Sequence, residues 1–281
     1  MEISASLVKD LRDRTGAGMM DCKKALGESN GDLERAATIL RERGIAKASS
    51  KEGRATAEGV IATYINQGDK LAVMVEVNCE TDFVARTDQF KAFARDVAVH
   101  LIGQGQSYVK ENDAALDNLV KSAIAQFGEN TQVKRFIRYQ FTGGVASYTH
   151  PGDKLAVMVE VDCANQSIVA KDEFKTFARD IAMHVAATNP VCVKRDELDT
   201  SLLTKEREIY RQQALNDGKP AQIVDKIVDG RVEKYYGEVV LMEQPYVKDN
   251  DKTITDLVKS AIAQFGESVQ IKRFIRYRLG E

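Results

Sequence analysis

The sequence predicts an α+β fold: a small module of three helices, followed by two copies of one unit in which helices pack on one face of an antiparallel sheet. Three observations lead to this prediction. Residues 1–45 have a helical pattern of apolar residues. Residues 69–84 return with few changes as residues 153–168. Within the repeated unit, strand-like segments precede and follow helix-like segments.

Residues 1–45 contain the start and stop signals of three short helices. Ser4 is suited to cap the first helix, because its hydroxyl can accept a hydrogen bond from a free backbone N–H. The two glycines within residues 15–18 predict a turn before a second helix over residues 19–26. A third helix is expected to end at Gly44 in a C-terminal capping position.

The first copy of the repeated unit is expected over residues 59–142, after a small, polar and charged segment that predicts a linker, or a partly helical linker, at residues 46–58. Its order is strand, turn, strand, tip, two helices and a last strand. That last strand alternates apolar and polar residues, which indicates that one of its faces is solvated. These segments are residues 60–65, 66–69, 71–77, 78–87, 88–101, 113–127 and 132–141.

The second copy is expected over residues 143–281 and contains an insertion. Its offset from the first copy is 84 residues through His184 and 138 residues over residues 257–267, so about 54 residues have been added between these points. Two helical patterns separated by a Gly-Lys-Pro turn predict a protruding helical hairpin over about residues 190–237. The two helices are expected at about residues 197–216 and 221–236.

The composition, with 43% hydrophobic and 29% charged residues, is ordinary for a soluble globular protein. A net charge of −2 argues against a non-specific nucleic-acid binder, which needs a basic surplus. The sequence has no signal peptide and no apolar segment of the ~20 residues needed to span a bilayer, so a cytoplasmic protein without membrane contact is expected. The four cysteines show no C-x-x-C spacing and are interpreted as reduced thiols.

The sequence lacks the common enzyme motifs. It contains no G-x-x-x-x-G-K-[ST] phosphate loop, no G-x-G-x-x-G after a strand and no H-E-x-x-H. Glu80 and Asp82 are two carboxylates on one expected loop, but no histidine or third acid lies near them, so a metal site is the weaker interpretation. A protein that is not an enzyme, with no cofactor and no metal, is therefore expected.

The two copies differ most at the tip that follows the second strand. Glu-Thr-Asp-Phe at residues 80–83 is replaced by Ala-Asn-Gln-Ser at residues 164–167. The shared residues are expected to build the fold, and the divergent tip to carry the function. Phe83 stands opposite Ser167, so a core position would leave a void in the second copy. Phe83 is therefore predicted to be a projecting anchor, with a core phenylalanine as the alternative.

Histidines and methionines supply further candidates. His100 and His184 occupy equivalent positions in the two copies, which predicts structural roles. His150 lies in the expected hairpin turn of the second copy, where it is either only solvated or functional. Met19 and Met20 follow a glycine-rich turn and are either core residues or an exposed, adaptable contact surface.

The segment Lys-Arg-Phe-Ile-Arg-Tyr occurs at residues 134–139 and again at residues 272–277. Interleaved basic and aromatic residues are typical of single-stranded RNA binders, so an RNA-binding or ribosome-associated module is the alternative function. Amphipathic strands in both copies explain the repeated segment better. A third option is a structural dimer in which the helical hairpin carries the function.

Several segments resemble the bacterial-type elongation factor Ts family. The most specific are T-G-A-G-M-M-D-C-K within residues 7–26 and T-D-F-V within residues 77–84. Together with further segments at residues 147–157, 181–190 and 237–247, the resemblance covers nearly the whole chain. It implies an N-terminal module similar to ubiquitin-associated domains, two related core subdomains and a coiled-coil hairpin arm.

The resemblance also implies guanine nucleotide exchange on the translational GTPase elongation factor Tu, in its GDP-bound and nucleotide-free forms, during polypeptide elongation. The T-D-F-V segment of the family is associated with dislodging Mg²⁺ from the GTPase, and it falls on Thr81, Asp82, Phe83 and Val84. The other contact positions of the family fall on Arg12, Met19, Met20, Lys23, His150, Lys51 and Val247.

Two features depart from the pattern of the family. Some members continue into a C-terminal helical module that also contacts the GTPase, whereas this sequence ends at Glu281, so that contact is not expected. Lys248 stands where some members have an apolar residue. A homodimer or a 2:2 complex through the second subdomain or its arm stays open, and no direct nucleic-acid contact is expected.

Overall fold

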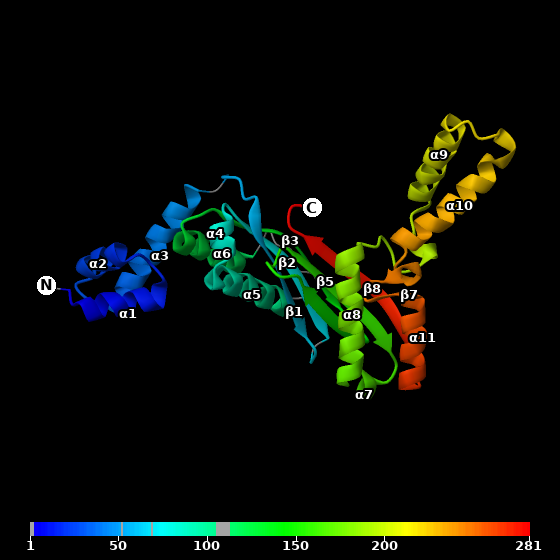
Figure 1. Cartoon of the computed structure of the whole chain (residues 1–281). Helices are drawn as coiled ribbons and strands as arrows, with labels where there is room; N and C mark the ends of the chain where they lie inside the picture. Colours follow the sequence, from blue (N-terminus) through cyan, green and yellow to red (C-terminus); the bar gives the residue numbers. More distant parts are fainter. Residues whose placement is uncertain (1–2, 52, 69, 105–112) are drawn as a thin grey trace.

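The computed structural model describes residues 3–51, 53–68, 70–104 and 113–281, with the backbone alone at residues 45–49. The molecule is elongated (Figure 1). The N-terminal helices lie at one end, two sheets with their helices occupy the middle, and a helical hairpin projects at the other end. The predicted α+β fold is confirmed.

The N-terminal module contains the three predicted helices. They are α1 (Ala5–Thr15), α2 (Met19–Glu28) and α3 (Leu33–Ser49). The Ser4 hydroxyl accepts a hydrogen bond from the N–H of Leu7 (3.2 Å), as expected for an N-cap. Leu11, Cys22 and Leu26 are fully buried in the small core that the helices share.

The third helix does not end at Gly44, and this prediction is wrong. The helix α3 continues to Ser49, so the first residues of the predicted linker are helical. A side chain at Gly44 would place its Cβ 2.8 Å from the Cβ of Ala125 in α6 (Ala114–Phe127). Glycine is therefore required at this position for the close crossing of two helices, and not for a helix end.

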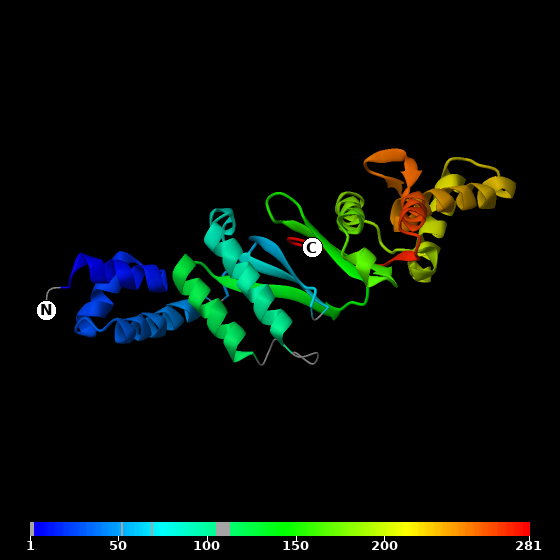
Figure 2. The ribbon, with the colours of Figure 1, turned by 90° about the horizontal axis from the view of Figure 1, so that it is seen from below.

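The first repeated unit is a three-stranded antiparallel sheet with helices on one face. Its elements besides α6 are β1 (Glu58–Asn66), β2 (Leu71–Cys79), α4 (Asp82–Ala85), α5 (Asp88–Gly103) and β3 (Thr131–Gln140). The strand order is β1-β2-β3, and α5 and α6 lie together against the sheet (Figure 2). Val73, Val75 and Val77 of β2 pack with Phe90 of α5. Asp69 of the predicted turn lies outside the described residues.

The second unit repeats this arrangement. Its elements are β4 (Gly144–Thr149), β5 (Leu155–Cys163), α7 (Gln166–Val169), α8 (Asp172–Thr188), α11 (Ile254–Phe265) and β8 (Val269–Arg278). The strand order is β4-β5-β8, with Val157 and Val159 packed against Phe174 of α8. Even the β-bulge recurs, between Glu76 and Val77 in the first sheet and at the equivalent residues of the second.

The two sheets pack face to face through their other faces. Ala72 and Met74 of β2 alternate with the helix-facing valines and share one cluster with Ala156 and Met158 of β5. Both central strands are thus buried on two sides, which explains the uninterrupted apolar run that they share. Tyr139 of the last strand also belongs to this cluster. The predicted alternation is confirmed at the two ends of this strand, where Gln132, Lys134 and Gln140 are exposed, whereas its middle residues 135–138 are half-buried.

Two ion pairs, each between a buried glutamate and a partly exposed arginine and related by an internal pseudo-two-fold, lie where the sheets meet. Arg135 lies 2.7 Å from Glu76 of its own sheet and 4.2 Å from the ring centroid of Tyr277 in the other sheet. Arg273 lies 2.6 Å from Glu160 and 4.0 Å from the centroid of the equivalent tyrosine in the first sheet. The repeated Lys-Arg-Phe-Ile-Arg-Tyr strands therefore hold the sheets together. Because arginines cover these tyrosine rings, this packing does not support the RNA-binding alternative.

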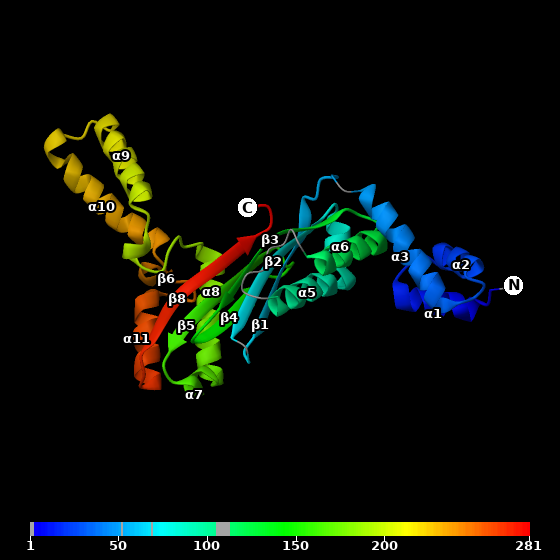
Figure 3. The same cartoon turned by 180° about the vertical axis from the view of Figure 1, so that it is seen from behind.

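The insertion forms the predicted helical hairpin. The helices α9 (Thr200–Asn216) and α10 (Ala221–Val239) pack antiparallel around Ala214, Val224 and Val228 and project away from the sheets (Figures 1 and 3). The segments that join the hairpin to the second unit are two 3-10 turns (Arg195–Glu197 and Leu241–Glu243) and the strands β6 (Pro245–Tyr246) and β7 (Asp249–Thr253).

The four cysteines are buried and free, as predicted. Within the described residues, no helix combines the length and the apolar character needed to cross a membrane.

Candidate functional site

The divergent tip of the first unit lies on the surface at α4. Thr81 is the N-cap residue of this one-turn helix, and its Oγ1 accepts a hydrogen bond from the N–H of Val84 (3.4 Å). Phe83 is 81% exposed, whereas Val84 packs against the core of the first unit. The equivalent Ser167 is also exposed. The predicted projection of Phe83 is confirmed, and its role as an anchor stays a prediction.

The loop that follows α6 holds the tip. Glu129 accepts two hydrogen bonds from Thr81, one from the N–H to Oε2 (2.9 Å) and one from the hydroxyl to Oε1 (2.6 Å). In the opposite direction, Glu80 accepts a hydrogen bond from the N–H of Asn130 (2.6 Å). Glu129 was not a sequence-based candidate, because Glu267 occupies the same position in the second copy and the two copies show no contrast there.

The other charged groups at the tip have partners of their own. Asp82 forms an ion pair with Arg86 (2.8 Å), and Glu80 lies 3.5 Å from Arg54. The two carboxylates therefore engage separate cations. Lys51 donates a hydrogen bond to a backbone carbonyl of the loop that follows α6. The structure thus brings Lys51 to the loop that holds the tip, although the two are distant in sequence.

The N-terminal module exposes its candidate contact residues. Met19 is 59% exposed and Met20 is 65% exposed at the start of α2, so the alternative that they are core residues is wrong. Arg12 and Lys23 are also exposed. Arg12 borders a cavity of about 620 Å³ whose opposite wall includes Phe127 of α6. The module therefore faces the first unit across this cavity.

His150 and Val247 lie on the second unit. His150 is exposed in the turn after β4, with its Nδ1 3.0 Å from the hydroxyl of Tyr148. Val247 is exposed in the turn after β6, and its N–H donates a hydrogen bond to Nδ1 of His184 (3.3 Å). Among the described residues, no hydrogen bond or ion pair links either residue to the tip.

The two equivalent histidines have structural roles, as predicted. Nε2 of His100 lies 2.5 Å from Oδ2 of Asp113. His184 is fully buried and donates from Nε2 to the side-chain oxygen of Gln244 (2.9 Å). Burial lowers the pKa of His184 from its ordinary value of 6.5, and the hydrogen bond to Gln244 opposes this shift.

Acid is expected to destabilise the protein through His184. The unfolded chain takes up a proton near pH 6.5, whereas the folded state resists it until a lower pH. The stabilisation is thus complete above about pH 6.5 and is lost as the pH falls toward the lowered pKa. A tenfold difference in proton affinity between the two states corresponds to about 1.4 kcal/mol of unfolding free energy. Urea unfolding at pH 7.5 and 5.5 measures this loss. His184→Gln should show a smaller loss, and an equal loss in both proteins contradicts the assignment.

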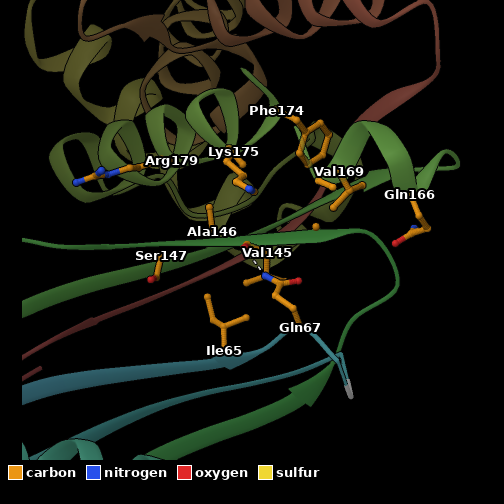
Figure 4. A pocket seen from close by; sticks show the side chains of 13 residues that line it. Ile65, Gln67, Val145, Ala146, Ser147, Gln166, Val169, Phe174, Lys175 and Arg179 are labelled. Carbon is orange, nitrogen blue, oxygen red and sulfur yellow. Dashed lines mark hydrogen bonds between the residues drawn. The ribbon is translucent and has the colours of Figure 1, made fainter. Parts of the chain in front are cut away.

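A cavity of about 500 Å³ lies between the two units (Figure 4). Gln67 at the end of β1 and Phe174 and Lys175 of α8 are among the residues that line it. The equivalent cavity of the first unit has only about 170 Å³. The first unit has Val60 at the position of Gly144. In the second unit a side chain is excluded at this position, because a Cβ at Gly144 would lie 2.7 Å from the Phe174 ring. None of the candidate residues lines the cavity between the two units, so the candidate site remains at the tip and the exposed contact positions.

Comparisons with known proteins agree with this arrangement. A family model described as "Elongation factor TS" matches residues 80–281. Elongation factor Ts of Clostridium botulinum (strain Eklund 17B / Type B) is 45% identical over 287 residues, which covers 99% of this chain and 93% of the relative. Elongation factor Ts of Trichlorobacter lovleyi is 42% identical over 291 residues, covering 100% and 94%. The chain therefore belongs to the elongation factor Ts family, the nucleotide exchange factors for elongation factor Tu in translation elongation.

Proposed function

We propose that the tip of the first unit promotes GDP release by dislodging Mg²⁺ from elongation factor Tu, with Phe83 as the wedge and Thr81, Asp82 and Val84 as its support. The observation that carries this proposal is an aromatic ring, 81% exposed, on a one-turn helix. Such rings are typical anchors of interfaces. The absence of this ring from the otherwise similar second unit supports a role beyond the fold.

Exchange by this route needs no covalent chemistry. A factor that binds the nucleotide-free GTPase more tightly than the GDP-bound form weakens GDP binding by the same ratio. Mg²⁺ is a large local positive charge beside the phosphates, so its displacement removes much of the attraction that holds GDP. The residues of the exchange factor need only bind and position, which agrees with a protein that is not an enzyme.

The second proposed contact is the N-terminal module. Met19 and Met20 offer a flexible apolar surface beside Arg12 and Lys23, which suits a helix of the GTPase. Lys51, at the loop that holds the tip, would extend the contact made by the tip. Further contacts would come from His150 and Val247 on the second unit.

Replacing Met20 by serine is expected to weaken binding of nucleotide-free elongation factor Tu about 5- to 30-fold, because the apolar side chain no longer leaves water on docking. Calorimetric titration measures the dissociation constant. Ile209→Ser, at an exposed apolar position of the hairpin arm, is the matched control and should leave the constant unchanged. A larger loss for the Ile209 variant would favour the structural-dimer option, in which the arm carries the function.

The arm and the second unit are also where a homodimer or a 2:2 complex would form. The arm exposes the apolar side chains of Leu202, Ile209, Leu215 and Ile223. The proposed site of action is the cytoplasm, because translation elongation takes place there.

The function is tested by release of a fluorescent GDP analogue from elongation factor Tu of the same organism in the presence of Mg²⁺. Substoichiometric amounts of this protein should accelerate release many-fold. If release proceeds at the same rate with and without the protein, the exchange function is wrong for this chain.

A further inference from the structure

We propose that Glu129 is a positioning residue for the tip, whose carboxylate sets the direction of Phe83 by holding Thr81 at the N-cap of α4. The proposal rests on the function proposed above for Phe83. Three features of the structure support it. The helix α4 is short, both carboxylate oxygens of Glu129 accept hydrogen bonds from Thr81, and, among the described residues, the equivalent Glu267 of the second unit forms no such bonds.

The helix α4 is too short to hold its own geometry. It has four residues, and a single helical turn is unstable in isolation because one hydrogen bond does not offset the cost of fixing the backbone. The direction of Phe83 therefore depends on what fixes the two ends of the turn. The C-terminal end is held by the buried Ala85. The N-terminal end is held through Thr81.

Both carboxylate oxygens of Glu129 accept hydrogen bonds from Thr81. Oε2 accepts the backbone N–H (2.9 Å), and Oε1 accepts the hydroxyl (2.6 Å). Because the hydroxyl hydrogen points to Glu129, the oxygen of Thr81 is left to accept the N–H of Val84 (3.4 Å). The carboxylate thus fixes both the backbone and the cap two residues before Phe83. Hydrogen bonds to an ionised acceptor are stronger than neutral ones.

The loop that carries Glu129 is itself fixed. Gly128 ends α6 in the left-handed region, with φ of 74°. Two residues after Gly128, Asn130 donates two hydrogen bonds. Its backbone N–H donates to Glu80 (2.6 Å), and its side-chain amide donates to the carbonyl of Arg54 (2.8 Å). The tip and the loop are therefore joined by hydrogen bonds in both directions. Glu80 of the tip accepts from the loop, and Glu129 of the loop accepts from the tip.

The second unit has a glutamate at the same position but lacks the hydrogen bonds between this glutamate and the N-cap residue, both of which the structure describes. Glu267 stands at the position of Glu129 and forms no hydrogen bond or ion pair with any other described residue. Asn165 replaces the threonine, and its own Oδ1 accepts the N–H of Ser167 (3.1 Å). The carboxylate–threonine pair thus occurs only in the unit whose tip carries an aromatic ring.

The test compares Glu129→Ala with Glu267→Ala, each in the wild-type and in the Phe83→Ala background. GDP release from Mg²⁺-bound elongation factor Tu is measured over a range of factor concentrations. Glu129→Ala should lower the maximal rate about tenfold, which is the effect of one charge-assisted hydrogen bond. The half-saturating concentration should change less than twofold, because the N-terminal module still binds. Glu267→Ala should match the wild type.

The Phe83→Ala background separates positioning from a general structural role. If Glu129 acts only through Phe83, its loss has no further effect once the ring is gone. Thr81→Val removes the hydroxyl that donates to Oε1 of Glu129 and should lower the maximal rate as Glu129→Ala does. If Glu129→Ala lowers the melting temperature, Glu129→Gln, which keeps the shape, is used and should lose part of the rate.

Three outcomes overturn the proposal while leaving the exchange function intact. They are a wild-type rate in Glu129→Ala, an equal loss in Glu267→Ala, and a further loss from Glu129→Ala in the Phe83→Ala background. A Phe83→Ala protein with the wild-type rate contradicts the proposed role of the tip itself, and the positioning role falls with it.

Discussion

Replacing Phe83 by alanine is expected to slow factor-catalysed GDP release about 30- to 1000-fold. Truncation of a central aromatic anchor typically costs ~2–4 kcal/mol of binding, which corresponds to that range of rates. The ring is 81% exposed in the free protein, so its removal should leave the melting temperature unchanged. Stopped-flow fluorescence of a labelled GDP measures the rate, and thermal unfolding confirms the fold.

Two controls belong to this experiment. Tyr64→Ala removes another exposed aromatic ring from the first unit, and Ser167→Ala changes the equivalent tip of the second unit. Both variants should exchange at the wild-type rate. A Phe83→Ala rate within threefold of wild type, or an equal loss in the Tyr64 variant, contradicts the assignment of Phe83 as the wedge.

The largest effect on stability is expected from Arg273→Ala. Glu160 is fully buried at the junction of the sheets, and Arg273 supplies its closest cation, at 2.6 Å. Removal of one partner from a fully buried ion pair leaves an uncompensated charge, at a cost of about 3–5 kcal/mol, and the 41% exposure of the Arg273 side chain reduces that cost here. Lys272, at 3.4 Å from Glu160, and the N–H of Thr142, at 3.0 Å, place the expected loss toward the lower end. Urea unfolding measures the loss of unfolding free energy.

The double variant Glu160→Met with Arg273→Met provides the control. It removes both charges at once and fills the space with apolar groups, so it should be more stable than Arg273→Ala. Arg135→Ala, at the pseudo-two-fold position, should destabilise in the same way through Glu76. A loss below about 1 kcal/mol for Arg273→Ala would mean that the two sheets do not depend on this ion pair.

The repeat made much of this fold predictable from the sequence. The shared strands located two sheets, and the change in offset located the arm. The contrast between Phe83 and Ser167 predicted an exposed ring, because a core position cannot lose a phenylalanine in one copy without a void. These inferences use local pattern and internal comparison, which the sequence contains.

The features that the sequence did not reveal share a physical cause, since each depends on a contact distant in the chain. Gly44 fits a helix end and a helix crossing equally well, and only Ala125 of another helix decides between them. The alternation in the last strand does not reveal that a second sheet packs against its middle, where Arg135 covers Tyr277. Glu129 was missed because its side chain bonds to Thr81 of the tip, which lies 48 residues earlier in the chain.

Whether Phe83 acts by displacing Mg²⁺ is tested by the ratio of wild-type to Phe83→Ala exchange rates, measured with Mg²⁺ present and with Mg²⁺ chelated. Without Mg²⁺ there is no ion for the tip to displace. We expect a large ratio with Mg²⁺ and a ratio near one after chelation. An equally large ratio in both conditions would rule out displacement of Mg²⁺ by Phe83, because Phe83 would then act through contacts that are independent of the metal.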